Sequence, residues 1–359
     1  MRLVIFLGYR IAHPSETEPC SRVVAMTAPK KPNIYDVAKL AGVSHQTVSR
    51  ALNGSGYIKP DTKSKVDAAM AELGYRPSQA ARALAVSKNN MIGLLVADTG
   101  LYGPAGMLNS MEREARSAGY FALSVAIESN APDTWADGIE HLGRLGIEGL
   151  ICIALSPAML QLAVESLPGI PVIAVDTAAH PGVTVVGIDN KNGARLAVEH
   201  LVKLGHRGIL HIAGPISSAE AVDRQVAYRA AMQNAGLKPI VQNGDWSADS
   251  GLAIGATFDF VGKGITAVFT ANDHLALGLQ RALKLRGIQV PNQVSIVGFD
   301  DIPESPYFET PLTTIRQDFK QLGEVAMAQL LGRLDGTVAA QVEPVTPKLV
   351  IRDSAVAVQ

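Results

Sequence analysis

Cysteine, aromatic residues and long apolar runs are all scarce in this 359-residue sequence. Its two cysteines, Cys20 and Cys152, stand far apart and form neither a disulfide framework nor a paired zinc site. Apolar runs stop after about eight residues, short of the roughly 20 that a membrane-spanning helix needs. These absences exclude small secreted scaffolds, zinc modules and membrane helices, and they favour a reducing compartment, the cytoplasm.

The sequence also lacks the common signatures of catalysis and nucleotide binding. It has no GxGxxG after the first strand-like run, no P-loop, no GxSxG elbow and no HExxH helix. The adjacent carboxylates Asp300 and Asp301 would point to opposite faces of a strand, so they do not form a catalytic pair. We therefore expect a protein that is not an enzyme and that uses no cofactor and no metal.

The composition indicates a folded protein of two or three domains, because 47% of the residues are hydrophobic and 18% are charged, and a domain averages about 150 residues. The net charge of −1 conceals an asymmetry. Residues 29–90 carry a net charge of +6, whereas residues 91–359 carry −8. A small cationic module joined to a large anionic one predicts a polyanionic partner for the first module.

Residues 1–32 belong to neither module. The opening MRLVIFL is basic and then apolar, as in a secretory signal, but Arg10 and His13 follow at once. Two other interpretations are open. The segment is a disordered extension, or the start codon is assigned too early and Met26 is the true first residue.

Residues 33–76 have the pattern of a helix-turn-helix domain. In IYDVAKLAGVSHQTVSRALNG, apolar residues recur at helical spacing, Gly42 ends the first helix and Ser44 can cap a second one. A third helix is expected from Pro60 to Leu73, closed by Gly74.

The second of these helices carries a polar surface around Val48, which must point inward. On that surface His45, Gln46 and Arg50 can read base edges in a major groove, since amide and guanidinium groups pair with adenine and guanine. Phosphates are the expected partners of Thr47, Ser49, Lys59 and Lys63. The alternative is a three-helix bundle with a solvated polar face.

Residues 77–90 predict a hinge helix and a linker. The stretch from Ser78 to Val86 is rich in alanine, has Leu84 as its one large apolar side chain and is too short to be a stable helix alone. It should fold against a partner, and Leu84 can insert between base steps of a minor groove. A passive linker is the alternative.

Residues 91–350 alternate strand-like runs with helical ones. The runs are MIGLLVA, YFALSVAI, EGLICIAL and PVIAVD, followed after Asp189 by GILHIAG, TAVFT and VSIVGF. Helices are expected between them at 112–118, 194–204, 221–235 and 275–286. Strands that are buried on both faces indicate doubly wound parallel sheets, and two series of strands indicate two α/β lobes with a cleft between them.

Sheets of this kind bind ligands beyond the carboxyl ends of their strands. The residues that end the expected strands are Asp98, Ser156, Asp176, Gly214, Asn272 and Asp300. Short carboxylates and amides suit a neutral polyhydroxylated ligand. Arg224 can add a charged fork and Trp246 an aromatic face, whereas Asp98 and Asp176 best suit a purely structural role.

Several motifs together resemble the lactose repressor family of bacterial transcription regulators. They are IYDVAKLAGVSHQTVSRALN, RPSQAARALA, GPISS, GDWSADSG, ANDHLALG, VGFDD and PLTTIRQDF, and the resemblance extends from about residue 33 to residue 350. It implies an N-terminal all-α helix-turn-helix domain followed by a two-lobed, doubly wound α/β domain of the periplasmic-binding-protein type. Lobe 1 would comprise about 91–187 and 316–345, lobe 2 about 188–315 and 346–352, and residues 353–359 a tail.

The resemblance also implies a function. A homodimer would bind double-stranded operator DNA at the nucleoid of a bacterial cytoplasm, and a small-molecule sugar in the cleft would release it, so that sugar-utilisation genes are expressed. The positions matched to DNA are His45, Gln46 and Arg50 on the recognition helix and Ser78, Ala81 and Leu84 in the hinge. The positions matched to the effector are Leu101, Pro104, Met107, Arg224, Trp246, Asn272, Asp300, Gln317 and Phe319.

This sequence departs from the family pattern at several sites. His45 replaces a tyrosine, Pro157 a sugar-binding aspartate, Glu220 a serine, His274 a glutamine and Ile188 a phenylalanine. These changes leave the operator and the effector open, with a β-galactoside as the leading candidate. The C-terminal VIRDSAVAVQ lacks the leucine heptads of a tetramer, which predicts a dimer.

Two alternatives stay open. The small molecule could act as a corepressor that strengthens DNA binding. The protein could also be a sugar-binding transport protein, although that class needs an export signal and has no use for residues 33–86.

Overall fold

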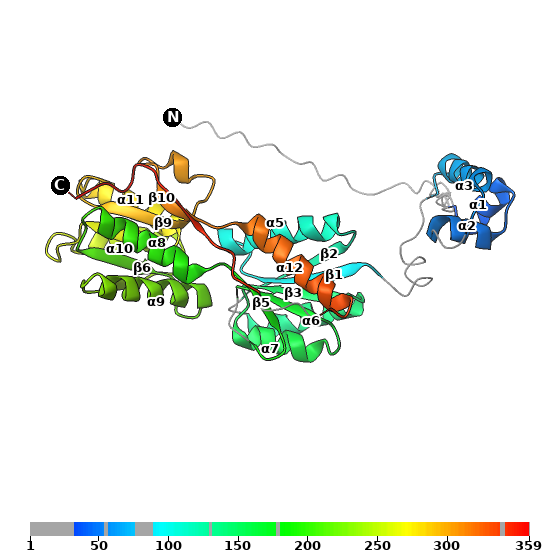
Figure 1. The fold of residues 1–359 in the computed structure, drawn as a ribbon, viewed down its shortest axis with the longest axis horizontal. Helices are drawn as coiled ribbons and strands as arrows, with labels where there is room; N and C mark the ends of the chain where they lie inside the picture. Colours follow the sequence, from blue (N-terminus) through cyan, green and yellow to red (C-terminus); the bar gives the residue numbers. More distant parts are fainter. Residues whose placement is uncertain are drawn as a thin grey trace, which may run out of the picture. The chain divides into compact units, whose positions relative to one another are not determined.

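The computed structural model describes residues 32–53, 57–75, 89–128, 131–176, 180–337 and 342–358. The chain divides into two compact units, Met1–Ala85 and Val86–Gln359, whose elements are labelled in Figure 1. Among the described residues, no helix combines the length and the apolar character that crossing a bilayer requires.

The described residues of the first unit form the helices α1 (Ile34–Ala41), α2 (His45–Asn53) and α3 (Pro60–Leu73). Asn33 begins α1 with a capping box, in which its side chain accepts from the Asp36 N–H while the Asp36 carboxylate accepts from the Asn33 N–H. Gly42 ends α1 in the left-handed region at φ 68°, where glycine carries no steric penalty. The small core between the helices consists of Val37, Ala38, Ala41, Val48, Val66 and Ala69.

The second unit contains two sheets, and both have the strand order of doubly wound folds. The first sheet is wholly parallel in the order β2-β1-β3-β4-β5, with β1 (Met91–Ala97), β2 (Phe121–Ile127), β3 (Gly149–Ile153), β4 (Val172–Val175) and β5 (Thr184–Val186). The second has the order β11-β10-β9-β8-β6-β7, with β6 (Ile209–Ala213), β7 (Ile240–Asn243), β8 (Ala267–Thr270), β9 (Ser295–Asp300), β10 (Thr313–Arg316) and β11 (Lys348–Val350).

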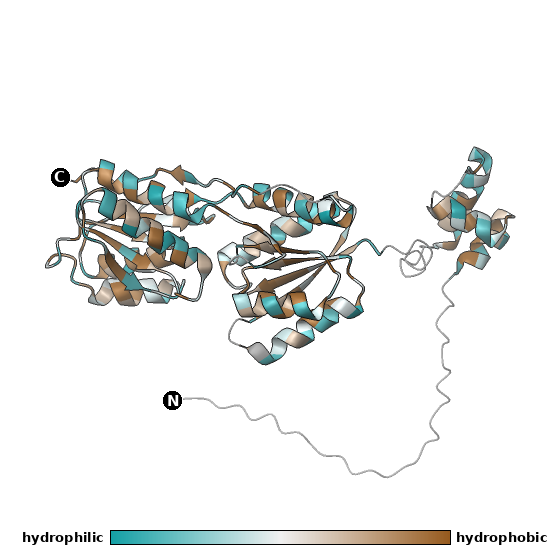
Figure 2. Cartoon of the chain, turned by 60° about the horizontal axis from the view of Figure 1, so that its bottom comes forward, coloured by the Kyte–Doolittle hydropathy of each residue, from teal (hydrophilic) through white to brown (hydrophobic). Residues whose placement is uncertain are grey.

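Helices cover both faces of each sheet. We call the first sheet with α5 (Tyr102–Ser117), α6 (Trp135–Arg144), α7 (Pro157–Ser166) and α12 (Phe319–Leu334) lobe 1. Lobe 2 is the second sheet with α8 (Asn190–Lys203), α9 (Ala219–Asn234), α10 (Ala248–Thr257) and α11 (Asp273–Leu285). The short 3-10 turns are Pro132–Thr134 and Ser305–Tyr307. Figure 2 shows the consequence of the sequence pattern, with apolar strands inside and hydrophilic helix faces outside.

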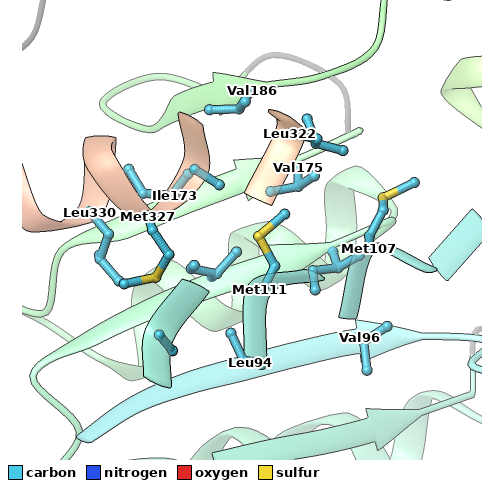
Figure 3. Close-up of a cluster of buried hydrophobic side chains, with 14 of the residues drawn as sticks. Leu94, Val96, Met107, Met111, Ile173, Val175, Val186, Leu322, Met327 and Leu330 are labelled. Carbon is cyan, nitrogen blue, oxygen red and sulfur yellow. The ribbon is translucent and has the colours of Figure 1, made fainter. Parts of the chain in front are cut away.

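The core of lobe 1 joins segments from opposite ends of this unit (Figure 3). Met107 and Met111 of α5 and Met327 of α12 lie together over Leu94 and Val96 of β1, and all of them are buried. Burying a side chain of this size contributes about 1.5–3 kcal/mol. Lobe 1 therefore depends on a helix that follows lobe 2 in the sequence.

The chain consequently crosses between the lobes three times, from β5 to α8, from β10 to α12 and from α12 to β11 (Figure 1). Two of the crossing segments lie side by side. The Val345 N–H donates to the Gly187 carbonyl at 2.8 Å, and the Asp189 N–H donates to the Val345 carbonyl at 2.9 Å. Gln317 lies on the third crossing, between β10 and α12.

The expected α/β architecture is confirmed, but several elements differ from the expectation. Helix α5 begins at Tyr102, ten residues before the expected start, although Gly103, Pro104 and Gly106 are typical of a loop. Pro104 is tolerated there because the first turn of a helix needs no N–H donor. Helices α8, α9 and α11 each begin two to four residues early.

Lobe 2 also differs from a purely parallel sheet, because β11 pairs with β10 in the antiparallel direction. The four strands β5, β7, β10 and β11 are three or four residues long and were not expected. Residues 353–358, expected as a tail, pack on lobe 2. Ser354 is buried, and its Oγ accepts from the Thr313 N–H at 2.8 Å and donates to the Ile296 carbonyl at 2.7 Å.

Candidate functional sites

Helix α2 presents a polar surface because its start and its inner face are fixed locally. Ser44 caps the helix, accepting from the Thr47 N–H at 3.1 Å, and Val48 is fully buried. As a result His45, Gln46 and Arg50 are exposed. Thr47 and Ser49 are partly buried, while Lys59 and Lys63 near the start of α3 are exposed.

Tyr35 adds an aromatic group to this surface. Its side chain is 65% exposed although it lies on α1, and its ring centroid is 5.2 Å from that of His45. Sequence reasoning missed this residue, because an aromatic side chain within an apolar-periodic helix is ordinarily assigned to the core. The expected hinge positions Ser78, Ala81 and Leu84 lie outside the described residues.

The second unit contains a cavity of about 640 Å³ between the two lobes, a size suited to a small molecule. Its lining residues are Ala97, Asp98, Leu101, Pro104, Ala154, Leu155, Ser156, Pro157, Asp176, Pro215, Ser217, Ser218, Ala219, Glu220, Asp245 and Trp246. A chamber of about 40 Å³ adjoins it and shares five of these residues. We call the cavity and the chamber together the cleft.

The chamber gathers the expected effector positions except one. Leu101, Pro104, Met107, Arg224, Trp246, Asn272, Asp300 and Gln317 all line it, together with Tyr102, Gly103, Asp176 and Glu220. Phe319 is not among the lining residues. Its ring instead packs near one of the lining residues, with its centroid 5.9 Å from that of Tyr102.

Arg224 is the buried cation of the chamber, and its position is fixed from several sides. Its Nε donates to Asn190 Oδ1 at 2.8 Å and its Nη1 to the Ala271 carbonyl at 2.6 Å. Nη1 also lies 3.8 Å from Asp300 Oδ1, and the guanidinium carbon lies 3.7 Å from the centre of the Phe299 ring. Such multiple contacts keep a buried charge in one orientation.

Asp300 closes the floor of the chamber at the end of β9. Burial raises the pKa of its carboxyl group to about 7, and the charge of Arg224 opposes this shift. Its Oδ1 accepts from Gln317 Nε2 at 2.6 Å. The neighbouring Asp301 turns away from the cleft to form ion pairs with Arg316 at 2.5 Å and Arg352 at 2.6 Å.

Asn272 and Trp246 form a second wall. Asn272 caps α11 through Oδ1, which accepts from the Leu275 N–H at 2.9 Å, while its Nδ2 donates to the Trp246 carbonyl at 2.9 Å. The Trp246 ring packs over Gly214, where a Cβ atom would come within 2.6 Å of the indole. Gly214 therefore leaves room for a flat aromatic surface at the cleft.

Asp176 lines both parts of the cleft, although sequence reasoning favoured a structural role for it. It has both roles, since its Oδ1 also accepts from the Ile188 N–H at 3.0 Å. Burial and the charge of Glu220 raise the pKa of Asp176 to about 7. Its place at the end of β4 was the signal in the sequence that could have assigned Asp176 to the cleft.

The departures from the family pattern that fall in the second unit divide into two groups. Pro157 and Glu220 line the cleft. In contrast, Ile188 is buried in the core of lobe 1 and His274 is partly buried at the start of α11. Among the described residues, no group of three or more His, Cys, Asp or Glu side chains is arranged to hold a metal ion.

Comparison with known proteins identifies both units. Residues 33–78 match the model of bacterial regulatory proteins of the lacI family, and residues 198–355 match a periplasmic binding protein-like domain. The chain is 35% identical over 306 residues to the lactose operon repressor of Escherichia coli (strain K12), with 84% of each chain covered. It is 32% identical to the ribose operon repressor of the same strain, covering 89% of this chain and 98% of that one.

Among solved structures, the lac repressor dimer bound to operator and the anti-inducer ONPF superimposes with a TM-score of 0.84 at 32% identity, covering 91% of this chain and 100% of that chain. The similarity spans the DNA-binding and ligand-binding regions together. The chain therefore belongs to the LacI family of bacterial transcriptional repressors, non-enzymatic proteins that bind operator DNA and small-molecule effectors and form dimers.

Proposed function

We propose that this repressor senses a hydroxyl-rich small molecule of the sugar class, with β-galactosides as the first candidates. The observation that carries the proposal is the floor of the cleft, where Arg224, Asp300 and Gln317 form a buried polar network beside the Trp246 ring. Carboxylates and amides bind hydroxyl groups in pairs, and an aromatic ring suits the apolar face of a sugar. The names of two relatives, repressors of a lactose and a ribose operon, agree with this class.

The DNA contacts in this proposal come from α2. His45, Gln46 and Arg50 read base edges in the major groove, and Thr47 with Ser49 binds phosphates. The exposure of the first three side chains supports these roles. Ser78, Ala81 and Leu84 are assigned to the minor groove by their positions in the family pattern alone.

The two sites act through one conformational equilibrium. The ligand-free dimer binds its operator, and a sugar that closes the lobes disfavours the DNA-bound arrangement. Coupling of this kind amounts to about 1–3 kcal/mol and is reciprocal, so operator DNA weakens sugar binding by the same factor. A corepressor would reverse the sign, and a competitive titration distinguishes the two.

The first experiment isolates a preferred duplex from random DNA with the full-length protein and then tests sugars for its release. We expect one duplex to be preferred over genomic competitor and at least one sugar to release it. A protein with no duplex preference, or with no response to any sugar, would contradict the proposal.

A second experiment replaces Asp300 with Asn. The variant should lose the response to the releasing sugar and keep its operator affinity, because Asp300 lies in the cleft and the change removes one acceptor charge. Asp335→Asn makes the same chemical change at an exposed position after α12 and serves as the control. A normal response in the Asp300 variant would exclude this carboxylate from the effector site.

A further inference from the structure

The walls of the cleft carry more negative than positive charge. Its charged lining residues are the carboxylates Asp98, Asp176, Glu220, Asp245 and Asp300 and the single guanidinium of Arg224. A neutral sugar needs no such excess, because hydroxyl groups both donate and accept hydrogen bonds. The excess of carboxylates in the cleft is therefore evidence about the charge of the ligand.

Arg224 balances this excess only in part, because it is one cation among several carboxylates and most of its hydrogen bonds go to uncharged groups. Its Nε and Nη1 donate to Asn190 and to the Ala271 carbonyl, and its nearest carboxylate is Asp300 at 3.8 Å. Asp300 is the carboxylate that interacts most strongly with Arg224, and Glu220 and Asp176 interact with it less strongly. Asp176 and Glu220 are therefore the less compensated carboxylates of the chamber.

Asp176 and Glu220 approach the cleft from opposite lobes. Asp176 directly follows β4 of lobe 1, while Glu220 lies in the first turn of α9 of lobe 2, and both line the cavity and the chamber. The negative charge of Glu220 raises the pKa of Asp176 more than the positive charge of Arg224 lowers it. Closure of the lobes on a neutral ligand would bring these like charges closer together.

Gln317 supplies an independent sign that the missing ligand donates hydrogen bonds. Its Nε2 donates to Asp300 Oδ1, which fixes the orientation of the amide when Asp300 is ionised, because the reverse orientation would then place two acceptor oxygen atoms together. Its Oε1 is then a buried acceptor without a partner among the described residues, and the side chain lines the chamber. A buried acceptor of this kind costs about 1–3 kcal/mol unless a donor reaches it.

We propose that the effector is a hydroxylated amine, such as an amino sugar, whose protonated nitrogen lies between the carboxylates of Asp176 and Glu220. This deepens the proposed function and rests on it. An ammonium group has three donors and no acceptor, which suits two carboxylates that line the chamber from opposite lobes, and a further hydroxyl or N–H of the same ligand reaches Gln317 Oε1. The cation joins both lobes, so its binding favours closure. A metal ion is disfavoured, since no cluster of three ligating side chains occurs in the described residues.

The test measures binding of matched sugars to the full-length protein by titration calorimetry. D-galactosamine and D-glucosamine are each compared with the parent hexose and with the N-acetyl derivative, at one pH and one ionic strength. At least one amine should bind about tenfold more tightly than its parent, and N-acetylation should remove this gain because it removes the charge.

Two variants assign the preference to Glu220. Glu220→Gln should reduce the advantage of the amine over its neutral parent to less than about threefold. Asp223→Asn removes the same charge from the same helix, but Asp223 pairs with Lys191 and does not line the cleft, so the preference should persist. Thermal unfolding and operator binding of both variants verify that they are folded, and Glu220→Ser provides a second replacement.

The outcomes separate this inference from the function on which it rests. Equal binding of an amine and its neutral parent, or an amine preference that survives in Glu220→Gln, would overturn the inference while sugar sensing stands. Failure of both neutral and amino sugars to bind would contradict the inference and the proposed function together.

Discussion

The helix-turn-helix unit and the ligand-binding unit use polar side chains in opposite ways. Helix α2 leaves His45, Gln46 and Arg50 in solvent, while Val48 between them is buried. The cleft instead buries Arg224 and Asp300 within the fold. Exposed polar side chains contribute little to the free energy of unfolding. Buried polar side chains that bind a ligand contribute to both stability and binding. Substitutions in the two regions should therefore be separable by whether they change binding alone or binding and stability together.

The largest effect is expected from Arg224→Ala. The variant leaves the Asp300 carboxylate buried without its cation, which should lower the free energy of unfolding by about 3–5 kcal/mol. Urea denaturation of the full-length protein measures this loss. Arg195→Ala is the control, because Arg195 pairs with Glu199 on the exposed face of α8, and it should cost no more than about 1 kcal/mol. Equal losses in the two variants would contradict the contrast drawn here.

Asp176→Asn should stabilise the ligand-free protein by about 1–3 kcal/mol at pH 8. The pKa of Asp176 is about 7 in the folded state against 3.8 for a free side chain, so the ionised carboxylate destabilises the fold at high pH. The gain should be complete above pH 7 and should shrink as the pH falls from 7 toward 4, where both states bind the proton. Urea denaturation at pH 8, 6 and 5 measures it. A gain that is independent of pH would show that the buried charge is not its cause.

Arg50→Ala tests the exposed region. Loss of the guanidinium fork should remove about 1–3 kcal/mol of discrimination between the preferred duplex and its single-base variants, with an unchanged free energy of unfolding. Competition binding measures the discrimination. Lys63→Ala, at an exposed position on α3, should weaken binding to all duplexes alike and reduce the salt slope by about 1. If Arg50→Ala behaves in the same uniform way, Arg50 contacts phosphate rather than bases.

Ser44→Ala should have the smallest effect. It removes the cap of α2 and should cost about 1 kcal/mol, a large share of the stability of so small a unit. Hydrogen exchange of the α2 amides measures the loss. Ser218→Ala removes the equivalent cap of α9 and should leave α2 exchange unchanged. Unaltered exchange in Ser44→Ala would mean that packing of Val48 alone holds the helix.

The elements that could be predicted from the sequence are those whose signal is local. Gly42 and Ser44 mark the turn between α1 and α2, and the apolar run 91–97 coincides with β1. Helix α5 was placed ten residues late, because its first turn contains residues that elsewhere break helices. Strands as short as β7, which is half exposed, have neither the length nor the apolar character to be recognised alone.

The cleft could be predicted only in part, because it forms where two lobes meet. Asn272 and Asp300 were expected there from their places at strand ends, and both line the chamber. For Asp176 the sequence offered only its place at the end of β4, and no local pattern links it to Glu220, which lines the cleft from the other lobe. Phe319 does not line the chamber for a similar reason, because the packing of α12 on α5 decides which side chains reach it.

Because the chain crosses between the lobes three times, the parts of the protein can fold only in a certain order during translation. Helices α1 to α3 can fold as soon as they emerge, but the apolar face of β1 has to wait for α12, which is translated close to the end of the chain. A nascent chain halted before α12 would have a complete helix-turn-helix unit. Its ligand-binding unit would be incomplete, with the hydrophobic face of β1 exposed.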